Sequence, residues 1–189
     1  MRALALRHSF GGKGSCTLDL ASDAYIFARL YQPQEALEKV NALIIHHAMG
    51  NLLLCLCDWR PESGLNWFGD RRVFQIEASF GLMAAMTQML LQDHGGLIRL
   101  LPALPREWAD GSVSGLCARG GFEIAMTWKQ GKLTHAQVIS QRGGRCRVQV
   151  MTGQPLCGIL YDGRRETAAL TQGGYEFDTR EQGIYELIF

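Results

Sequence analysis

The chain has 189 residues, of which 47% are hydrophobic and 20% are charged. A chain of this composition is too apolar to be disordered, and it is long enough to bury one sizeable core or two small ones. Its 19 basic and 18 acidic residues give a net charge of +1, which provides no electrostatic footprint for a nucleic-acid partner. No apolar run reaches the roughly 18 residues of a membrane-spanning helix, so we expect no membrane partner.

The first residues of the chain and its cysteines indicate in which compartment the protein is expected and whether it binds a metal. The apolar part of residues 1–8 is too short for a signal peptide, so the chain as given is expected to be cytoplasmic, although a longer parent could be secreted. The six scattered cysteines favour buried free thiols over a disulfide framework. Cys55 and Cys57 are too close in sequence for a zinc knuckle, and the adjacent His46 and His47 diverge on a helix. We expect neither a metal site nor a cofactor.

In the first half of the chain, apolar residues recur at the spacing that is typical of α-helices. Apolar side chains at helical spacing predict a helix over residues 17–31, with Thr17 as its cap. A second helix is expected over residues 34–49, because Pro33 suits a first turn. One face of this second helix is predicted to carry Leu37, Val40, Ile44 and His47. A third helix, over residues 78–92, has so few polar residues that other helices should enclose it almost completely.

After Gly96 the apolar residues recur at the spacing that is typical of β-strands. Candidate strands separated by turn residues cover 97–101, 115–119, 122–128, 133–140, 146–151, 158–161 and 184–189. In the strand at 122–128, large apolar residues alternate with smaller or polar ones, which predicts one buried face. Strands spaced by about 8–12 residues are typical of an antiparallel sandwich or a small barrel.

The connection before the third helix is the best candidate for a functional site. Residues 58–73 form a long segment with several aromatic residues, including Trp67, and Glu77 follows at the start of the helix. Position alone favours a carboxylate stabilised by the helix dipole. The functional alternative is a proton-transfer carboxylate in a partly dry cleft, beside Gln75 and aromatic faces that would bind a sugar. Candidates for a second carboxylate are Asp58, Glu62 and Asp70.

Several motifs together resemble a known enzyme family. They are FQIEASFG at 74–81, MLLQ at 89–92, LLPALP at 100–105, Trp108, DGSVSGL at 110–116 and RGGFE at 119–123. In these runs the chain resembles the C-terminal part of family 95 glycoside hydrolases, which include inverting α-L-fucosidases and related α-L-galactosidases. The resemblance implies that residues 1–96 are the last helices of an (α/α)6 barrel and that residues 97–189 form a small antiparallel β-sandwich domain.

The resemblance also implies roles for individual residues. In the family, a Glu general acid comes from an earlier barrel segment, and an Asp activates an Asn on the base side. Glu77 stands in the place of that Asp and Ser79 in that of the Asn. Arg71 stands where the family has a His that contacts the sugar. We therefore take Glu77 as the catalytic candidate, and the candidates for substrate binding are Gln75, Arg71 and Trp67.

The expected function follows from this resemblance and from the departures from it. Glu77 reaches one methylene further than Asp, and a misplacement of about 1 Å can cost roughly a hundredfold in rate. We expect a C-terminal fragment of an inverting hydrolase of terminal α-L-fucosyl or α-L-galactosyl linkages in oligosaccharides or glycoconjugates, inactive alone. The alternative is a non-catalytic carbohydrate-binding or structural β-sandwich module. An open half-barrel would expose apolar helix faces, so we also expect self-association.

Overall fold

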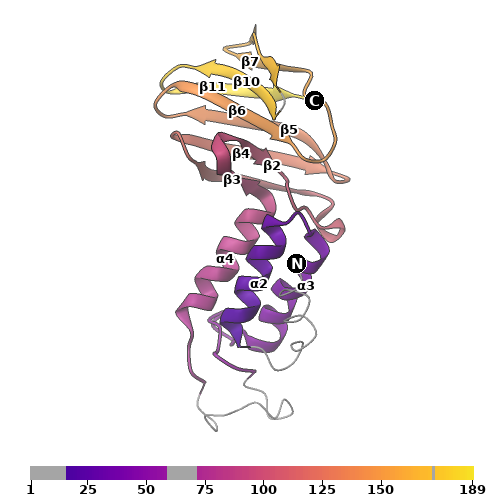
Figure 1. Ribbon diagram of the computed structural model, residues 1–189, viewed down its shortest axis with the longest axis vertical. Coiled ribbons are helices and arrows are strands. Elements are labelled where there is room, and N and C mark those ends of the chain that lie inside the picture. The colour runs from indigo at the N-terminus through magenta and orange to yellow at the C-terminus, as the bar shows by residue number, and fades with distance from the viewer. Residues whose placement is uncertain (1–15, 59–71, 172) are drawn as a thin grey trace. The chain divides into compact units, whose positions relative to one another are not determined.

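The computed structural model describes residues 16–58, 72–171 and 173–189. Its contacts divide the chain into two compact units, Met1–Gln88 and Met89–Phe189, and each is described by itself. The first unit is helical and the second is built from strands (Figure 1), which confirms the predicted order of helices followed by strands. Within these described ranges, no helix combines the length and the apolar character needed to cross a membrane. The predicted domain boundary after residue 96 stays a prediction.

In the described part of the helical unit, the first two helices are joined by a short turn. Its helices are α2 (Thr17–Arg29), α3 (Pro33–Ala42), the π-helix η1 (Leu43–His47) and most of α4 (Ile76–Leu90). Pro33 lies in the first turn of α3, as predicted. The prediction that Thr17 caps α2 was wrong, because Cys16 is the N-cap residue and makes no side-chain cap bond. Thr17 is already helical, and its hydroxyl group bonds elsewhere in the unit.

The π-helical turn η1 changes which side chains of the second helix are buried. A π-helix has i→i+5 hydrogen bonds and therefore more residues in each turn than an α-helix. Leu43 is completely buried, whereas Ile44 is 48% exposed, so the prediction that Ile44 shares one face with Leu37, Val40 and His47 was wrong. The other three predicted members of that face, Leu37, Val40 and His47, are buried.

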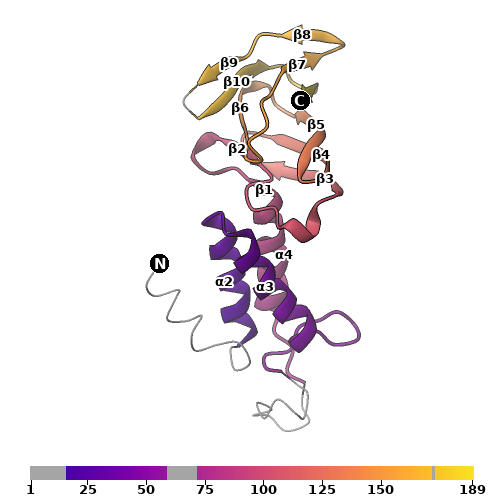
Figure 2. The same ribbon diagram turned by 90° about the vertical axis from the view of Figure 1, so that its right-hand side faces the viewer.

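Helices α2 and α4 lie side by side and run in the same direction (Figures 1 and 2). The side chain of Thr17 at the start of α2 meets Gln75, which precedes α4. Near the other end, Arg29 Nη1 donates to Gln88 Oε1 at 3.3 Å. Between these contacts Gly81 approaches Ala21 so closely that a Cβ atom at Gly81 would lie 2.9 Å from the Cβ of Ala21. Two parallel helices with a return helix between them are what successive antiparallel helical hairpins produce.

The β unit contains two sheets with mostly antiparallel neighbours. The strands are β1 (Leu91–Gln92), β2 (Ile98–Leu100), β3 (Gly111–Ala118), β4 (Phe122–Lys129), β5 (Lys132–Ser140), β6 (Gly144–Val150), β7 (Gly158–Tyr161), β8 (Arg164–Glu166), β9 (Ala169–Thr171), β10 (Gly174–Thr179) and β11 (Gly183–Ile188). One sheet has the order β1-β2-β6-β10-β9 and the other β3-β4-β5-β11-β7-β8. Only β2 and β6 are parallel neighbours among these strands. Short 3-10 turns, η3 (His94–Gly96) and η4 (Arg106–Trp108), precede β2 and β3.

Apolar side chains from both sheets form one core, which agrees with the predicted β-sandwich. The predicted alternation in β4 is confirmed, because its large apolar side chains are buried and its intervening residues are not: Phe122, Ile124, Met126 and Trp128 point inward. Val148 of β6 and Phe177 of β10 enter the same core from the other sheet. The strands β1, β8, β9 and β10 were not predicted from the sequence.

Candidate functional site

The candidate site lies where α2 and α4 begin, and an extended segment holds the two helix starts together. Gln75 N donates to Leu54 O at 2.9 Å, and Leu56 N donates to Val73 O at 2.8 Å. On its other side, Leu56 O accepts from Thr17 N at 3.2 Å and lies at the same distance from Thr17 Oγ1. Residues 54–56 therefore bridge α2 to the segment that leads into α4.

The side chain of Gln75 is held by α2. Its Oε1 atom accepts hydrogen bonds from the Thr17 hydroxyl and from Cys16 Sγ, the latter at 3.4 Å. Thr17 is completely buried and Gln75 is half-buried, so the first of these contacts is shielded from water. With its carbonyl oxygen engaged in this way, the remaining polar atom of the Gln75 side chain is its amide nitrogen, a hydrogen-bond donor. The prediction that Thr17 caps a helix did not include the hydrogen bond by which its hydroxyl group positions Gln75.

Glu77 and Ser79 lie on the first turn of α4. The Glu77 side chain is exposed, and the positive end of the helix dipole stabilises its negative charge. The Ser79 hydroxyl is buried and has no hydrogen-bond partner among the described residues. A buried hydroxyl without a partner costs about 1–3 kcal/mol, so Ser79 is a group with unused hydrogen-bonding capacity two residues after Glu77.

The other predicted site residues are only partly covered by the structure. Arg71 and Trp67 lie outside the described residues, as do two of the candidate second carboxylates, Glu62 and Asp70. Asp58 is buried, and its Oδ2 lies 3.6 Å from His46 Nδ1. The structure thus brings Gln75 and Glu77 together at the start of α4, and the assignment of site residues stays a prediction.

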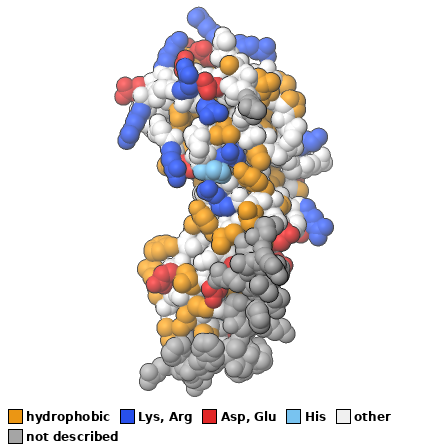
Figure 3. All heavy atoms as spheres, viewed as in Figure 1, with side chains coloured by type: hydrophobic (Ala, Val, Ile, Leu, Met, Phe, Trp, Pro, Cys, Tyr) orange, Lys and Arg blue, Asp and Glu red, His pale blue; other side chains and the backbone are white. Residues whose placement is uncertain are grey.

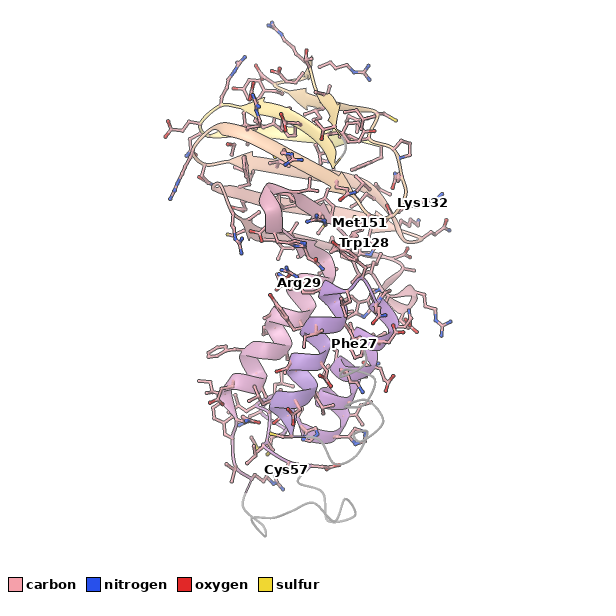
Figure 4. All side chains as sticks on the ribbon, in the orientation of Figure 1. Phe27, Arg29, Cys57, Trp128, Lys132 and Met151 are labelled. Atoms are coloured by element: carbon pink, nitrogen blue, oxygen red, sulfur yellow. The ribbon has the colours of Figure 1, made fainter. Side chains whose placement is uncertain are left out.

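Three cysteines, Cys16, Cys55 and Cys57, lie close to the starts of α2 and α4. Burial raises the pKa of Cys55, opposed by the charge of Arg72. Burial also raises the pKa of Cys57, and the neighbouring Cys16 thiol raises it further. Figure 4 shows Cys57 at the end of the helical unit where α2 and α4 begin. In the described part of the chain, no group of three or more His, Cys, Asp or Glu side chains is placed to hold a metal ion.

One side of α4 is apolar and open in the described structure. Ile76, Phe80 and Met83 are 47%, 67% and 62% exposed, and Figure 3 shows hydrophobic side chains gathered over this helix. A shallow apolar groove of about 220 Å³ lies nearby, lined by Leu18, Ala21, Ser22, Tyr25, Ile26 and Gly81. The described residues therefore cover only part of the helix that the sequence predicts to be enclosed.

Residues of the sequence motifs in the β unit hold turns and strands in place. Asp110 Oδ1 accepts from Gln130 N at 2.6 Å, which anchors the tight turn between β4 and β5. Trp128 Nε1 donates to Trp108 O at 2.8 Å, and Trp128 is only 5% exposed. Asp93 Oδ2 accepts from Arg119 N at 2.8 Å. These contacts give the motifs a structural role in this unit.

Comparison with known proteins identifies the family. A family model described as glycoside hydrolase family 95, C-terminal domain, matches residues 92–187. The chain is 35% identical to Alpha-L-fucosidase 2 of Arabidopsis thaliana over 127 residues, covering 63% of this chain and 14% of the relative. It is 34% identical over 96 residues to Probable alpha-fucosidase A of Aspergillus niger, covering 45% of this chain and 12% of that protein. The chain thus spans no more than 14% of the length of these relatives.

The similarity extends beyond the β unit. A continuous stretch that covers 63% of 189 residues must include α4, wherever it begins, so the alignment with the Arabidopsis relative contains Gln75 and Glu77. The family model covers half of the chain and most of the β unit. This chain therefore belongs to glycoside hydrolase family 95 and is the C-terminal part of a family protein.

Proposed function

We propose that the chain is the C-terminal portion of an inverting glycoside hydrolase that acts on terminal α-L-fucosyl, or related α-L-galactosyl, linkages. The observation that carries this proposal is the extent of the alignment with Alpha-L-fucosidase 2, which includes α4 and Glu77 as well as part of the β unit. The parallel arrangement of α2 and α4 supports a further proposal, that the helical unit contributes the last helices of an (α/α)6 barrel.

An inverting hydrolase needs two carboxyl groups on opposite sides of the scissile bond. They are about 6.5–9.5 Å apart, because a water molecule must fit between one of them and the sugar. Glu77, on the first turn of α4, would supply the negative charge on the side of the attacking water. Gln75, oriented by Thr17, would donate its amide hydrogen to a sugar hydroxyl group. Arg71 and Trp67 would complete the substrate contacts.

The proposal also holds that the isolated chain is catalytically incomplete. The resemblance to the family places the general acid on an earlier barrel segment, and Glu77 is one methylene longer than the family's Asp. Without a positioned general acid, the leaving oxygen would depart unprotonated, which typically costs a factor of about 10²–10⁴ in rate.

A chimera tests this function. This chain would replace the matching C-terminal part of the Arabidopsis relative, and hydrolysis of an aryl α-L-fucoside would be measured. Turnover by the chimera, together with none by the isolated chain, is the expected result. A chimera that folds, by circular dichroism, yet leaves both the fucoside and the corresponding α-L-galactoside intact would overturn the proposal. Robust turnover by the isolated chain would overturn its incompleteness.

A non-catalytic carbohydrate-binding or structural module is the second candidate. It is favoured by the match of the family model to the β unit alone, and that unit has its own apolar core. Titration calorimetry with L-fucose distinguishes the two candidates. Saturable binding by the isolated chain that is kept in both Gln75→Ala and Glu77→Gln would assign the binding to the β unit and favour the binding module, whereas loss of binding in Gln75→Ala would favour the hydrolase site.

A further inference from the structure

Cys16 and Cys57 lie next to each other although 41 positions separate them in the sequence. Thr17 N donates to Leu56 O at 3.2 Å, so Cys16 and Cys57 are the residues that flank this backbone hydrogen bond. Standard peptide dimensions then place their Cα atoms no more than about 8 Å apart. The Cα atoms of disulfide-bonded cysteines are usually about 4.4–6.8 Å apart. The upper limit of about 8 Å is close to this range, and a separation above about 7 Å would require the backbone to move before the bond forms.

The third thiol of this region differs in accessibility. Cys16 and Cys57 are both partly exposed, whereas Cys55 is only 1% exposed. The backbone of Cys55 is also fixed, because its N–H donates to His47 O at 2.9 Å and the residue forms a bridge with Phe74. A small reagent in solution therefore reaches Cys16 and Cys57 before it reaches Cys55.

We propose that Cys16 and Cys57 form a reversible disulfide, which makes the start of α2 a redox-modified site. A low-molecular-weight disulfide such as oxidised glutathione serves as the oxidant. The thiolate of one cysteine attacks this disulfide, forms a mixed disulfide and releases one reduced thiolate. The second cysteine loses its proton, attacks the protein sulfur of the mixed disulfide and releases the second thiolate. The two protein thiols lose two electrons and two protons, and the reagent accepts them as two thiols.

The bond would change the surroundings of Gln75. In the reduced chain, Cys16 Sγ donates to Gln75 Oε1 at 3.4 Å. A disulfide sulfur has no proton to donate, so Gln75 would keep only the Thr17 hydroxyl as a donor to Oε1. The start of α2 would at the same time be tied covalently to the extended segment that pairs with residues 73–75. This inference is independent of the sugar that the protein acts on.

Peptide mapping tests the proposal directly. The full chain carrying Cys117→Ser and Cys157→Ser, which removes two exposed thiols, is incubated with oxidised glutathione at mildly alkaline pH. Alkaline buffer is needed because the raised pKa of Cys57 leaves little thiolate at neutral pH. Free thiols are then alkylated, and proteolytic peptides are sequenced by mass spectrometry without reduction. The expected product is a peptide pair joined through Cys16 and Cys57 that separates on reduction.

Two further variants serve as matched controls. Cys57→Ser should abolish the joined pair, and Cys55→Ser should leave its yield unchanged. Glutathione adducts on Cys16 and Cys57 without a bond between them would overturn the proposal. So would a joined pair that contains Cys55 in place of Cys57, which fragment ions distinguish. The peptide map of the chain that retains Cys16, Cys55 and Cys57 shows which two cysteines are joined, even if a control variant fails to fold.

Discussion

The Thr17 hydroxyl, at the first position of α2, donates a hydrogen bond to Gln75 Oε1, just before α4. This contact joins two segments that are 58 residues apart in sequence. It fixes the side chain of a predicted sugar-binding residue before any substrate arrives. Thr17 therefore acts as a positioning residue for Gln75, and through it for the start of the helix that carries Glu77.

Thr17→Val tests this positioning role. Valine has nearly the same shape but cannot donate to Gln75 Oε1, so it leaves a half-buried acceptor without this donor. The expected loss in free energy of unfolding is about 1–3 kcal/mol. Urea unfolding followed by far-UV circular dichroism measures it. Thr17→Ser keeps the hydroxyl group and should lose less than half as much. Equal losses in the two variants would show that packing, and not the hydrogen bond, matters here.

A buried pair of hydroxyl groups connects the two sheets of the β unit. Ser140 Oγ of β5 lies 2.8 Å from Thr179 Oγ1 of β10, and Thr179 Oγ1 is 2.6 Å from Gly144 O. Thr179→Val should lower the free energy of unfolding by about 1–3 kcal/mol, because it leaves buried polar groups unsatisfied. Thr179→Ser is the matched control and should stay closer to the original stability. Thermal unfolding of both variants, compared with the original chain, provides the measurement.

Gly111 lies against the ring of Trp128. A Cβ atom at this glycine would lie 2.4 Å from the indole ring, too close for any side chain. Gly111→Ala should therefore force Trp128 to move and cost about 1–3 kcal/mol of stability. The neighbouring exposed substitution Ser112→Ala should cost almost nothing. Tryptophan fluorescence during urea unfolding reports both effects, and an unchanged midpoint for Gly111→Ala would contradict the close contact.

The burial of Cys146 predicts how the folding stability of the chain changes with pH. Burial raises the pKa of this thiol to about 12, above its ordinary value of 9.0. Because the pKa of Cys146 is higher in the folded chain, the unfolded chain loses the thiol proton at a lower pH. The contribution of Cys146 to the free energy of unfolding is therefore complete below pH 9 and declines as the pH rises toward 12. Cys146→Ala should show a smaller loss of stability across this range than the original chain. Parallel slopes for the two proteins would contradict the prediction.

The open face of α4 predicts association. Phe80 and Met83 are large, apolar and mostly exposed in the described structure, and contiguous apolar surface promotes association in water. The purified chain should therefore run as an oligomer in light scattering after size exclusion. Phe80→Glu should shift it toward the monomer, whereas Thr87→Glu on the same helix should shift it less. A monodisperse monomer of the original chain would contradict this prediction.

Much of the fold could be predicted from the sequence, and the misses have local physical causes. The bounds of β4 and β5 were nearly right because their apolar residues are patterned and their turn, Gln130-Gly131, has both residues at positive φ. The strands β8 and β9 have three residues each and are largely exposed, so they carry no pattern of burial. The exposure of Ile44 could not be foreseen, because a π-helical turn leaves no mark on apolar spacing.

The candidate site was harder to predict than the fold. Glu77 and Gln75 were chosen as candidates because they lie in a sequence motif at the start of a helix. The contacts that orient Gln75 were missed, since they come from Thr17 and Cys16, which are far away in sequence. Long-range pairing of this kind depends on the packing of α2 against α4, and no local pattern encodes it.

We propose that Glu77 serves the chemical step in a family 95 hydrolase whose C-terminal part this chain forms. The most direct test is kcat/KM of the chimera on an aryl α-L-fucoside with Glu77 intact, as Glu77→Gln and as Glu77→Asp. Removing the charge should lower kcat/KM by about a hundredfold or more, and shortening the side chain to the family's Asp should raise it. Equal activity of all three chimeras would contradict the claim.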